Sequence, residues 1–207
     1  MDSSEFQFSD DWFSRNIQVW DVLIERGKPL KILEIGSYEG RSACYLINTC
    51  TAYGALELVC VDTWRGGVDH DATLMAEVER RFDRNIALAK ARAPGKVEVR
   101  KIKAASNVAL AALIHSDGRE TFDLIYIDGS HTAPDVLTDA VLAFELLRVQ
   151  GLMIFDDYLW SMEPPGQQDP LNMPKPAIDA FVNIFQRKLM IYEGTPNHQL
   201  YCEKVSS

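Results

Sequence analysis

The chain has 207 residues, of which 47% are hydrophobic and 25% charged, and its net charge is −9. This length and composition suit one domain with a sizeable core, and the acidic balance argues against a nucleic-acid partner, because phosphate binding requires a basic face. No apolar run approaches the ~20 residues of a membrane span, and the first residues are unlike a signal peptide, so we expect no membrane partner and a cytoplasmic location.

The hydrophobic pattern predicts helices alternating with buried strands. The expected helices cover residues 10–25, 41–50, about 72–91, 107–115, 133–147 and 175–187. The expected strands cover residues 30–35, 57–61, 97–102, 124–128, 151–156, 189–192 and 199–204. This alternation predicts an α/β fold with a doubly wound, mostly parallel sheet, to which the last two strands add an antiparallel C-terminal hairpin.

Two segments stand apart from this regular alternation. Residues 1–29 precede the first strand and are expected to form a helical segment that either covers the pocket or makes a dimer contact, and the sequence leaves both open. Residues 159–176 form a Pro-rich loop that is too long for a simple connector and is predicted to be a lid. Thr132, with Asp135 three positions on, resembles a capping box at the start of a helix.

Three aspartates follow two of the expected strands at the point where each strand ends. Asp128 closes one apolar run, and Asp156 and Asp157 close another. If the two strands are parallel neighbours, their backbones lie ~4.8 Å apart and the acidic ends meet at one sheet edge. Converging carboxylates repel one another unless a proton or a cation lies between them, so we predict a site for Mg²⁺, or for Mn²⁺ or Ca²⁺. The alternative is that these acids cap helices or turns.

A glycine-bearing turn follows the first expected strand, with the pattern Glu34-x-Gly36-x-x-x-Gly40. Gly36 permits a tight turn against a ligand, and the start of the next helix offers free N–H groups. Dinucleotide-binding turns have a glycine where this chain has Tyr38, so a ligand without a pyrophosphate fits better. Glu34 would attract a cationic group such as an amine.

Asp62 ends the second expected strand, where a carboxylate can accept hydrogen bonds from the diol of a ribose. Its alternative role is a cap or turn residue. For Glu34 the alternative is a salt bridge at the end of the strand, and for Gly36 and Gly40 it is plain turn geometry. A single G-x-x-x-G pattern is a weak signal, but its place after the first strand, with an acid closing the second, strengthens it.

At these positions the chain resembles the class I S-adenosylmethionine-dependent methyltransferases. The resemblance covers about residue 31 to the C-terminus and rests on residues 34–40, 61–64, 127–131 and 155–158. It is strongest to metal-dependent O-methyltransferases of the macrolide-sugar type and weaker to the catechol and caffeoyl-CoA enzymes. It implies a Rossmann-like methyltransferase domain over residues 30–207.

The resemblance also implies a role for each part of the site. The glycine turn would hold the methionine part of S-adenosylmethionine, the acid after the second strand would hold ribose, and a residue after the third strand would reach adenine. The implied cofactor-binding residues are Glu34, Gly36, Ser37, Gly40, Asp62, Ser106 and Asp128, and the implied metal ligands are Asp128, Asp156 and Asp157.

His131 lies three residues after Asp128, at the rim of the predicted site. Methyl transfer to oxygen requires a hydroxyl to lose its proton, and histidine titrates near neutrality, so we predict His131 as the catalytic base. The resemblance implies a histidine at this position in sugar-type relatives and a lysine in catechol-type relatives. The alternatives are a histidine bonded to the backbone at a helix start and a metal ligand.

The sequence therefore predicts an S-adenosylmethionine-dependent, divalent-metal-assisted O-methyltransferase. Its partner would be a small-molecule hydroxyl acceptor such as a vicinal diol, a sugar or a catechol, in a pocket walled by Trp64, Tyr158 and Trp160. One alternative is a protein that binds S-adenosylmethionine without methyl transfer. Another is a nicotinamide-dependent oxidoreductase, which the glycine spacing and the lack of a Tyr-x-x-x-Lys pair disfavour. The sequence leaves a homodimer open.

Overall fold

The computed structural model describes residues 6–66 and 75–207, and over these residues seven strands form one sheet. The strands are β1 (Lys31–Ile35), β2 (Leu56–Asp62), β3 (Val97–Lys103), β4 (Phe122–Ile127), β5 (Leu147–Phe155), β6 (Leu189–Ile191) and β7 (Leu200–Lys204). Their order is β3-β2-β1-β4-β5-β7-β6, and β1 to β5 are parallel. β7 is antiparallel to both β5 and β6, so the predicted fold class and the C-terminal hairpin are confirmed.

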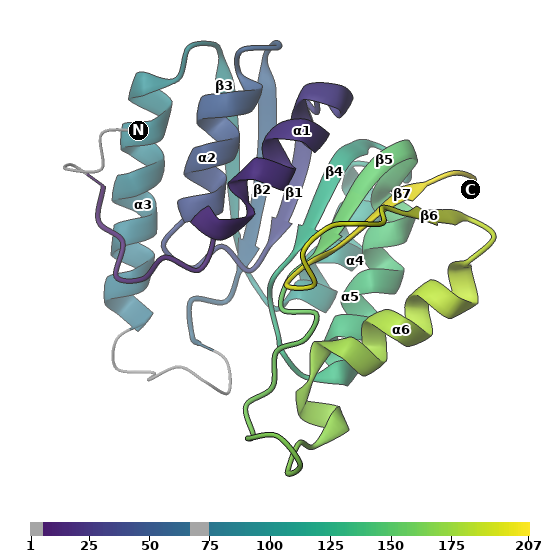
Figure 1. The fold of residues 1–207 in the computed structure, drawn as a ribbon. Coiled ribbons are helices and arrows are strands. Elements are labelled where there is room, and N and C mark those ends of the chain that lie inside the picture. The colour runs from purple at the N-terminus through teal and green to yellow at the C-terminus, as the bar shows by residue number, and fades with distance from the viewer. Residues whose placement is uncertain (1–5, 67–74) are drawn as a thin grey trace.

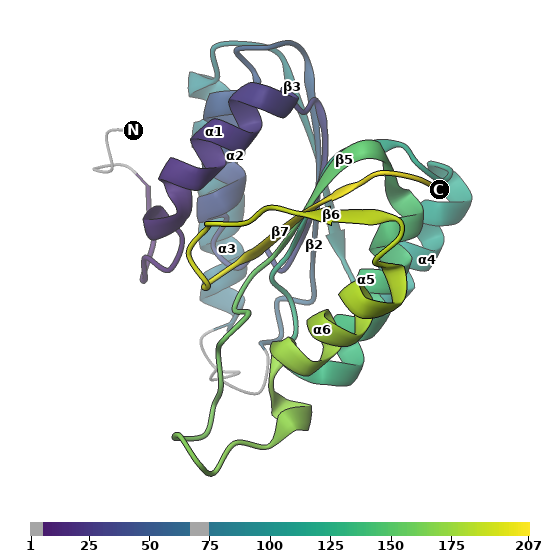
Figure 2. The same cartoon turned by 45° about the vertical axis from the view of Figure 1, so that its right-hand side comes forward.

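Helices cover both faces of this sheet (Figure 1). The helices of one face are α1 (Ile17–Gly27), α2 (Arg41–Cys50) and α3 (Met75–Arg92), and those of the other face are α4 (Ser106–Ser116), α5 (Ala133–Leu146) and α6 (Pro174–Phe185). Figure 2 shows the two helical layers on opposite sides of the strands. None of the helices in the described part of the chain is long and apolar enough to span a membrane.

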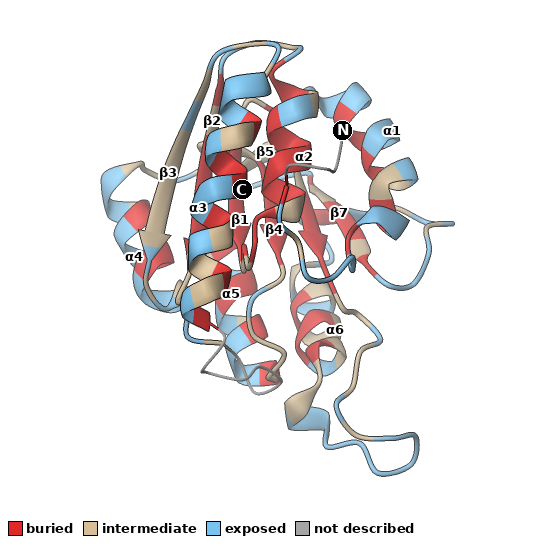
Figure 3. Ribbon diagram, turned by 90° about the vertical axis from the view of Figure 1, so that its left-hand side faces the viewer, coloured by how far each residue is buried: buried red, intermediate tan, exposed pale blue. Residues whose placement is uncertain are grey.

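The alternation of side chains along each strand divides the core into two halves. Leu124 and Tyr126 of β4 pack with the helices of the α1 layer, whereas Ile125 and Ile127 pack with those of the α5 layer. Figure 3 shows the central strands as buried and the edge strand β3 as only half-buried. The apolar runs that predicted buried strands are therefore the residues that both helical layers cover.

The sheet reverses its winding between β1 and β4. β1 pairs with β2 on one side and with β4 on the other, and the chain runs from β1 to β2 in one direction along the sheet and from β4 to β5 in the opposite direction. Open α/β sheets bind their ligands in the crevice beyond the carboxyl ends of the strands at this kind of reversal. The glycine turn after β1 and the acid after β4 both lie there.

The first helix begins later than predicted. Ser14–Asn16 form a 3-10 turn and α1 begins at Ile17, so the prediction of a helix from residue 10 is wrong. Earlier in the chain, the backbone N–H of Ser9 donates to Glu39 and the carbonyl of Asp10 accepts from Arg41. Both partners lie at the start of α2, so hydrogen bonds fix this segment without a helix.

β5 begins four residues before Gly151, the predicted start. Leu147 directly follows α5 and pairs with Phe122, and the register then shifts before Leu124 pairs with Leu152. Gln150 has a φ of 65° within this irregularity. A Cβ on Gly151 would lie 2.8 Å from the backbone carbonyl oxygen of Arg148, so the bulge favours a glycine at this position. The strand pattern alone predicts a strand boundary there.

The capping box predicted at Thr132 does not form. Its hydroxyl donates to the carboxylate of Asp135 over 2.9 Å and makes no bond to the free N–H groups of α5. Ser130 donates to the same carboxylate over 2.8 Å. Asp135 therefore organises the turn that leads from β4 into α5.

Asp117, which follows α4, joins the edge of the sheet to that helix. It accepts two hydrogen bonds from Arg100 of β3, of 3.1 and 2.6 Å, and lies 3.3 Å from the ammonium group of Lys31. Arg100 is the main cause that lowers the pKa of Asp117 to about 2. Because the folded-state pKa is lowered, this carboxylate stabilises the fold above the unfolded pKa, and the stabilisation is lost as the pH falls through the folded value.

We predict that Asp117→Asn lowers the free energy of unfolding by about 1 kcal/mol at pH 7, and that the difference from the wild type shrinks between pH 4 and pH 2. Urea unfolding at several pH values measures it. Asp83→Asn, which removes an exposed partner of Lys101, is the control and should change stability little. A difference for Asp117→Asn that is the same at pH 7 and pH 2.5 contradicts this assignment.

Candidate active site

A cavity of about 950 Å³ opens at the carboxyl edge of the sheet, beside the reversal between β1 and β4. The predicted site residues that line it are Gly36, Asp62, Ser106, Asp128, His131, Asp156 and Asp157. Ser37 lines a smaller adjoining pocket together with Gly36 and Asp128. Glu34 and Gly40 line neither space. The structure thus gathers most of the predicted residues, which come from five separate chain segments, into one place.

The parallel pairing of β4 and β5 brings the acids together. Ile127 lies opposite Phe155 in the register, and the N–H of Asp156 donates to the carbonyl of Ile127 over 2.9 Å. On the other side of β4, the N–H of Asp128 donates to the carbonyl of Ile35 over 2.7 Å. The backbone ladder therefore continues up to the acids themselves and fixes their positions.

Tyr126 lies beneath these acids. The sequence pattern did not identify it as a functional residue. Its hydroxyl contacts Oδ2 of Asp128 at 2.9 Å and also contacts Oδ2 of Asp156. Gln199 reaches the same hydroxyl at 3.5 Å and accepts a 2.8 Å hydrogen bond from Trp20 of α1. A tyrosine inside an apolar strand, two residues before an acid, is the signal that could have identified it, because both side chains then point to the same face.

Burial and mutual repulsion act on the acids in the same direction. Burial raises the pKa of Asp128 well above its usual range, and the carboxylates of Asp156 and Asp157 add to the rise. Burial also raises the pKa of Asp156, again with a contribution from Asp157. Each shift means that the carboxylates are costly to keep charged side by side without a counter-charge.

Among the described residues, Asp128, His131 and Asp157 form a group whose ligand atoms all lie within 4.8 Å of one another. His131 Nε2 lies 3.0 Å from Oδ2 of Asp157. Asp156 belongs to the acidic centre but is turned toward Tyr126 and toward the N–H of Asp157, which donates to it over 2.8 Å. The carboxylate oxygens of this group fit a hard divalent cation. The sequence predicted three aspartates as ligands, whereas the converging group contains His131 in place of Asp156.

The glycine turn packs directly on the acidic centre. Gly36 has a φ of 86°, and a Cβ there would overlap the backbone carbonyl of Asp128. Gly40 has a φ of 78°, and its Cβ would lie 2.9 Å from the ring of Phe82. Both positions therefore favour glycine for turn geometry and close packing, which is the alternative that the sequence left open, and contact of these glycines with a ligand stays a prediction.

Asp62 fastens this turn from the end of β2. Its Oδ2 accepts hydrogen bonds from the N–H groups of Ser37 and Tyr38, of 3.0 and 2.9 Å, and its Oδ1 accepts one of 2.7 Å from the N–H of Trp64. Tyr38 and Trp64 both have a φ of 47°. Such strained conformations persist where the surroundings fix them, and they cluster at functional sites. Contact of Asp62 with ribose stays a prediction.

Glu34 lies fully buried beneath the turn, away from the cavity surface. One of its oxygens accepts a 2.5 Å hydrogen bond from Ser42, and the other has no hydrogen-bond partner among the described residues. Burial raises the pKa of Glu34. A direct contact between Glu34 and the amino group of a ligand stays a prediction, because in this structure its side chain is covered.

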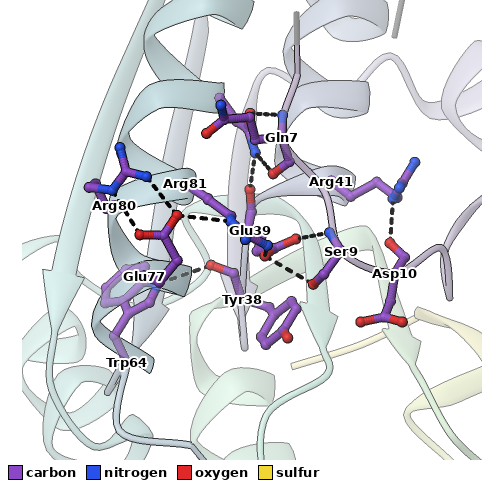
Figure 4. Close-up of polar contacts among 11 residues, drawn as sticks. Gln7, Ser9, Asp10, Tyr38, Glu39, Arg41, Trp64, Glu77, Arg80 and Arg81 are labelled. Atoms are coloured by element: carbon purple, nitrogen blue, oxygen red, sulfur yellow. Dashed lines mark hydrogen bonds and ion pairs between the residues drawn. The ribbon is translucent and has the colours of Figure 1, made fainter. Parts of the chain in front are cut away.

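The segment before α1 is tied to the glycine turn through Glu39, which is 2% exposed (Figure 4). Glu39 accepts hydrogen bonds from the N–H and the hydroxyl of Ser9, of 2.6 and 3.0 Å, and one of 2.8 Å from Arg81. Asn85 of α3 donates to the backbone carbonyls of Gln7 and Glu39, each over 2.9 Å. This network places Trp12 against the ring of Tyr38, with centroids 5.3 Å apart.

The aromatic wall of the cavity differs from the prediction. Trp160 lines the cavity, and its ring lies 4.2 Å from that of His131. Trp64 instead packs against Phe82, and the hydroxyl of Tyr158 donates to Asp179 of α6, so neither of these two residues lines the cavity. Trp12 and Tyr38 provide the other aromatic surfaces, and Trp12 reaches the cavity because the N-terminal segment folds back over the sheet edge.

The model of the methyltransferase domain family matches residues 33–158, which is more than half of the chain. The chain belongs to this methyltransferase family. The matched region runs from β1 to the residue after the last aspartate, and so it contains the glycine turn and the whole acidic centre. The resemblance to class I S-adenosylmethionine-dependent methyltransferases is thereby confirmed.

Solved structures of other methyltransferases share this fold. The O-methyltransferase TomG from Streptomyces achromogenes, in complex with SAM, is 16% identical with a TM-score of 0.63, over 95% of this chain and 82% of that one. An O-methyltransferase from Bacillus cereus, in complex with SAH, is 18% identical with a TM-score of 0.61, over 96% and 84%.

The methyltransferase MycE from the mycinamycin biosynthetic pathway, in complex with Mg and SAH, is 16% identical with a TM-score of 0.61. The match covers 95% of this chain and 51% of MycE. No curated protein matches the chain significantly. At these identities the structures establish that the methyltransferase has their fold.

We predict that Glu39→Gln lowers the free energy of unfolding of this methyltransferase by about 1–3 kcal/mol, because it disturbs a buried, charge-assisted set of hydrogen bonds. Denaturant unfolding gives the change in stability, and limited proteolysis gives the rate of cleavage within residues 6–13. Glu77→Gln removes another carboxylate from Arg81, but from an exposed position, and should have little effect. Equal effects of the two substitutions would show that the buried network does not hold the segment.

Proposed function

We propose that this methyltransferase moves the methyl group of S-adenosylmethionine to a hydroxyl oxygen of a small molecule, with the help of a divalent cation. The observation that carries the proposal is the convergence of Asp128, His131 and Asp157 in the cavity that the glycine turn also lines. Methyl transfer to oxygen needs a donor, a deprotonated hydroxyl and a means of aligning the two. The cavity contains candidate residues for binding the donor, for removing the proton from the hydroxyl and for aligning the two reactants.

The structural neighbours support the donor and the reaction. TomG and the Bacillus cereus protein are O-methyltransferases solved with SAM and with SAH, and MycE was solved with Mg and SAH. In this chain, Tyr38 occupies the place of a pyrophosphate-binding glycine, which suits a donor that carries no phosphates. S-adenosylmethionine, when bound, supplies a sulfonium group with an activated methyl carbon.

Asp62 and Ser106 are the residues that we propose for the nucleoside part of the donor. Both line the cavity, and they lie at the carboxyl ends of the neighbouring strands β2 and β3. Oδ2 of Asp62 already accepts two backbone hydrogen bonds and Oδ1 accepts one, so Oδ1 can accept one more. One hydroxyl of the ribose could therefore bind to Oδ1 without any rearrangement of the turn.

Asp128 and Asp157 are the residues that would hold the cation, with Asp156 or His131 beside them. Burial and mutual repulsion make this acidic centre costly without a counter-charge, so the residues present fit a hard cation. A bound cation supplies positive charge that lowers the pKa of a hydroxyl next to it. An acceptor with two adjacent oxygens would be best oriented there, which favours a vicinal diol, a sugar or a catechol.

His131 is the residue that we propose takes the proton from the acceptor. Its Nε2 points at Asp157, and the ring of Trp160 packs against it, so the imidazole is fixed in orientation. A base held in this way, beside an acidic group that stabilises its protonated form, needs no reorganisation during the reaction. The protonated imidazole would then share its charge with Asp157.

The segment before α1 is, in our proposal, a cover for this cavity and not a dimer contact. Trp12 and Arg15 line the cavity, and Phe8 and Phe13 line the adjoining pocket. The network around Glu39 ties the same segment to the glycine turn. Acceptor selection would then depend on this segment as well as on the loop that carries Trp160.

We predict that Mg²⁺ supports methyl transfer to a panel of diols and catechols, measured with radiolabelled S-adenosylmethionine, and that chelation abolishes it. Asp128→Asn should lower turnover by about 100-fold or more while leaving the affinity for S-adenosylhomocysteine within about threefold. Glu98→Gln, on the exposed edge strand, is the matched control. Full activity of Asp128→Asn in the presence of a chelator would refute the cation's role.

For His131→Gln we predict a fall in kcat of about 10²-fold to 10⁴-fold with a nearly unchanged affinity for Mn²⁺, because a base acts in the transition state and is not needed to bind the ion. Turnover measurements and Mn²⁺ titration followed by electron paramagnetic resonance separate the two quantities. Loss of Mn²⁺ affinity by tenfold or more would instead identify His131 as a ligand.

A further inference from the structure

A buried set of hydrogen bonds connects the C-terminal strand β7 with the acids of the proposed site. It begins at Gln199, which directly precedes β7 and is buried. β7 runs antiparallel to β5, with Leu200 opposite Phe155. Gln199 therefore lies beside Asp156, the residue that follows β5. The proposed reaction uses side chains that follow β4 and β5, and it assigns no role to β7.

Two donors fix the orientation of the Gln199 amide. The indole N–H of Trp20 donates to Oε1 over 2.8 Å, and the hydroxyl of Tyr201 donates to the same oxygen over 2.5 Å. An indole N–H can only donate, so the amide atom that faces Trp20 must be the oxygen. The amide nitrogen of Gln199 then faces Tyr126 and the acids.

The amide nitrogen of Gln199 reaches the hydroxyl of Tyr126 and also the acid next to it. It donates to the hydroxyl in a long hydrogen bond of 3.5 Å. Burial raises the pKa of Asp156, and a hydrogen bond from Gln199 opposes the rise. Because the tyrosine hydroxyl accepts from the amide, its single proton is directed toward the carboxylates of Asp128 and Asp156, which both contact it.

Core packing alone accounts for only one end of this arrangement. Trp20 and Tyr201 bring polar groups into the core, and Oε1 of Gln199 satisfies both of them, as buried polar groups require. The hydroxyl of Tyr126 is different, because its partners are two carboxylates that also line the cavity. The ring of Tyr126 already packs against that of Trp20, with centroids 4.9 Å apart, so the hydroxyl is not needed to fill the core.

We propose that Tyr126 is a positioning residue for the cation site, and that Gln199 holds its hydroxyl in the orientation that this role requires. The hydroxyl contacts Oδ2 of both Asp128 and Asp156, and so it holds two mutually repelling carboxylates at a fixed separation. This inference rests on the proposed function, because it concerns how the ligand acids Asp128 and Asp157 are presented to the cation.

Asp157 is positioned through its backbone. Its φ is 52°, a conformation that is strained for a residue other than glycine and persists where the surroundings fix it. Its N–H donates to Oδ1 of Asp156 over 2.8 Å, while Oδ2 of Asp156 is held by Tyr126. Tyr126 therefore acts on Asp128 directly and on Asp157 through Asp156. Loss of a group that orients the ligands of a metal typically lowers metal affinity by about 10-fold to 100-fold.

The test is a titration of the whole chain with Mn²⁺, followed by electron paramagnetic resonance. Tyr126→Phe keeps the ring in the core and removes only the hydroxyl, and we expect it to lower the affinity for Mn²⁺ by about tenfold or more. Its affinity for S-adenosylhomocysteine should stay within about threefold of the wild type, because the hydroxyl acts on the acids alone. Tyr192→Phe removes a different tyrosine hydroxyl, which donates to Glu203 of β7, and should leave Mn²⁺ binding unchanged.

A second variant tests the part of Gln199. Gln199→Met should also weaken Mn²⁺ binding, by about threefold or more. Combined with Tyr126→Phe, it should cause a loss smaller than the product of the two separate losses, because the amide acts largely through the hydroxyl. If Gln199→Met does not fold, the result for Tyr126→Phe decides the proposal alone.

Unchanged or tighter binding of Mn²⁺ by Tyr126→Phe overturns the positioning role. A lower melting temperature of this variant with the Mn²⁺ affinity intact would assign the hydroxyl to stability alone, and it overturns the proposal as well. Fully independent losses in the double variant overturn the link between Gln199 and Tyr126. If the wild type itself binds no Mn²⁺, the cation of the proposed function fails, and this inference fails with it.

Discussion

The site depends on one constraint, the parallel register that sets Ile127 of β4 opposite Phe155 of β5. This pairing ends both strands at the same edge and leaves Asp128 and Asp156 on adjacent backbones, with Tyr126 between their carboxylates. Carboxylates brought this close in a buried setting need a proton or a cation between them. The pairing of the central strands is stable because helices cover both faces of the sheet. This stable pairing holds the mutually repelling carboxylates in place.

The donor turn and the acidic centre are parts of the same packed unit. Gly36 leaves room for the carbonyl of Asp128, and Asp62 fastens the next two residues of the turn through their N–H groups. The ends of β1, β2 and β4 are thus connected by backbone contacts and hydrogen bonds. For an enzyme that must align a methyl group with an oxygen, such rigid connections between the donor loop and the reacting end are an advantage, since alignment supplies much of the rate.

The sequence predicted the parts of this site that follow from strand order. Apolar runs ending in acid identified Asp62, Asp128 and Asp156, because parallel strands share one carboxyl edge. It could not show which ligand atoms converge, since that depends on the conformation at Asp157, whose φ is 52°, and on the hydroxyl of Tyr126.

The N-terminal segment shows a second limit of sequence patterns. Helical spacing of apolar residues predicted a helix from residue 10, but hydrogen bonds from Ser9 to Glu39 and from Arg41 to the carbonyl of Asp10 fix that stretch without one. These partners lie about 30 residues away in the chain, so no local pattern contains them. The same contacts bring Trp12 over the cavity, and they therefore bear on acceptor selection as much as on the fold.

The most direct test of the central claim is a crystal structure of the enzyme with S-adenosylhomocysteine and Mn²⁺, with the ion located by its anomalous scattering. We predict one strong Mn²⁺ peak about 2.0–2.4 Å from carboxylate oxygens of both Asp128 and Asp157, beside the sulfur of the bound ligand. Carboxylates of Asp128 and Asp157 that stay apart, with Mn²⁺ found only on the outer surface, would contradict it.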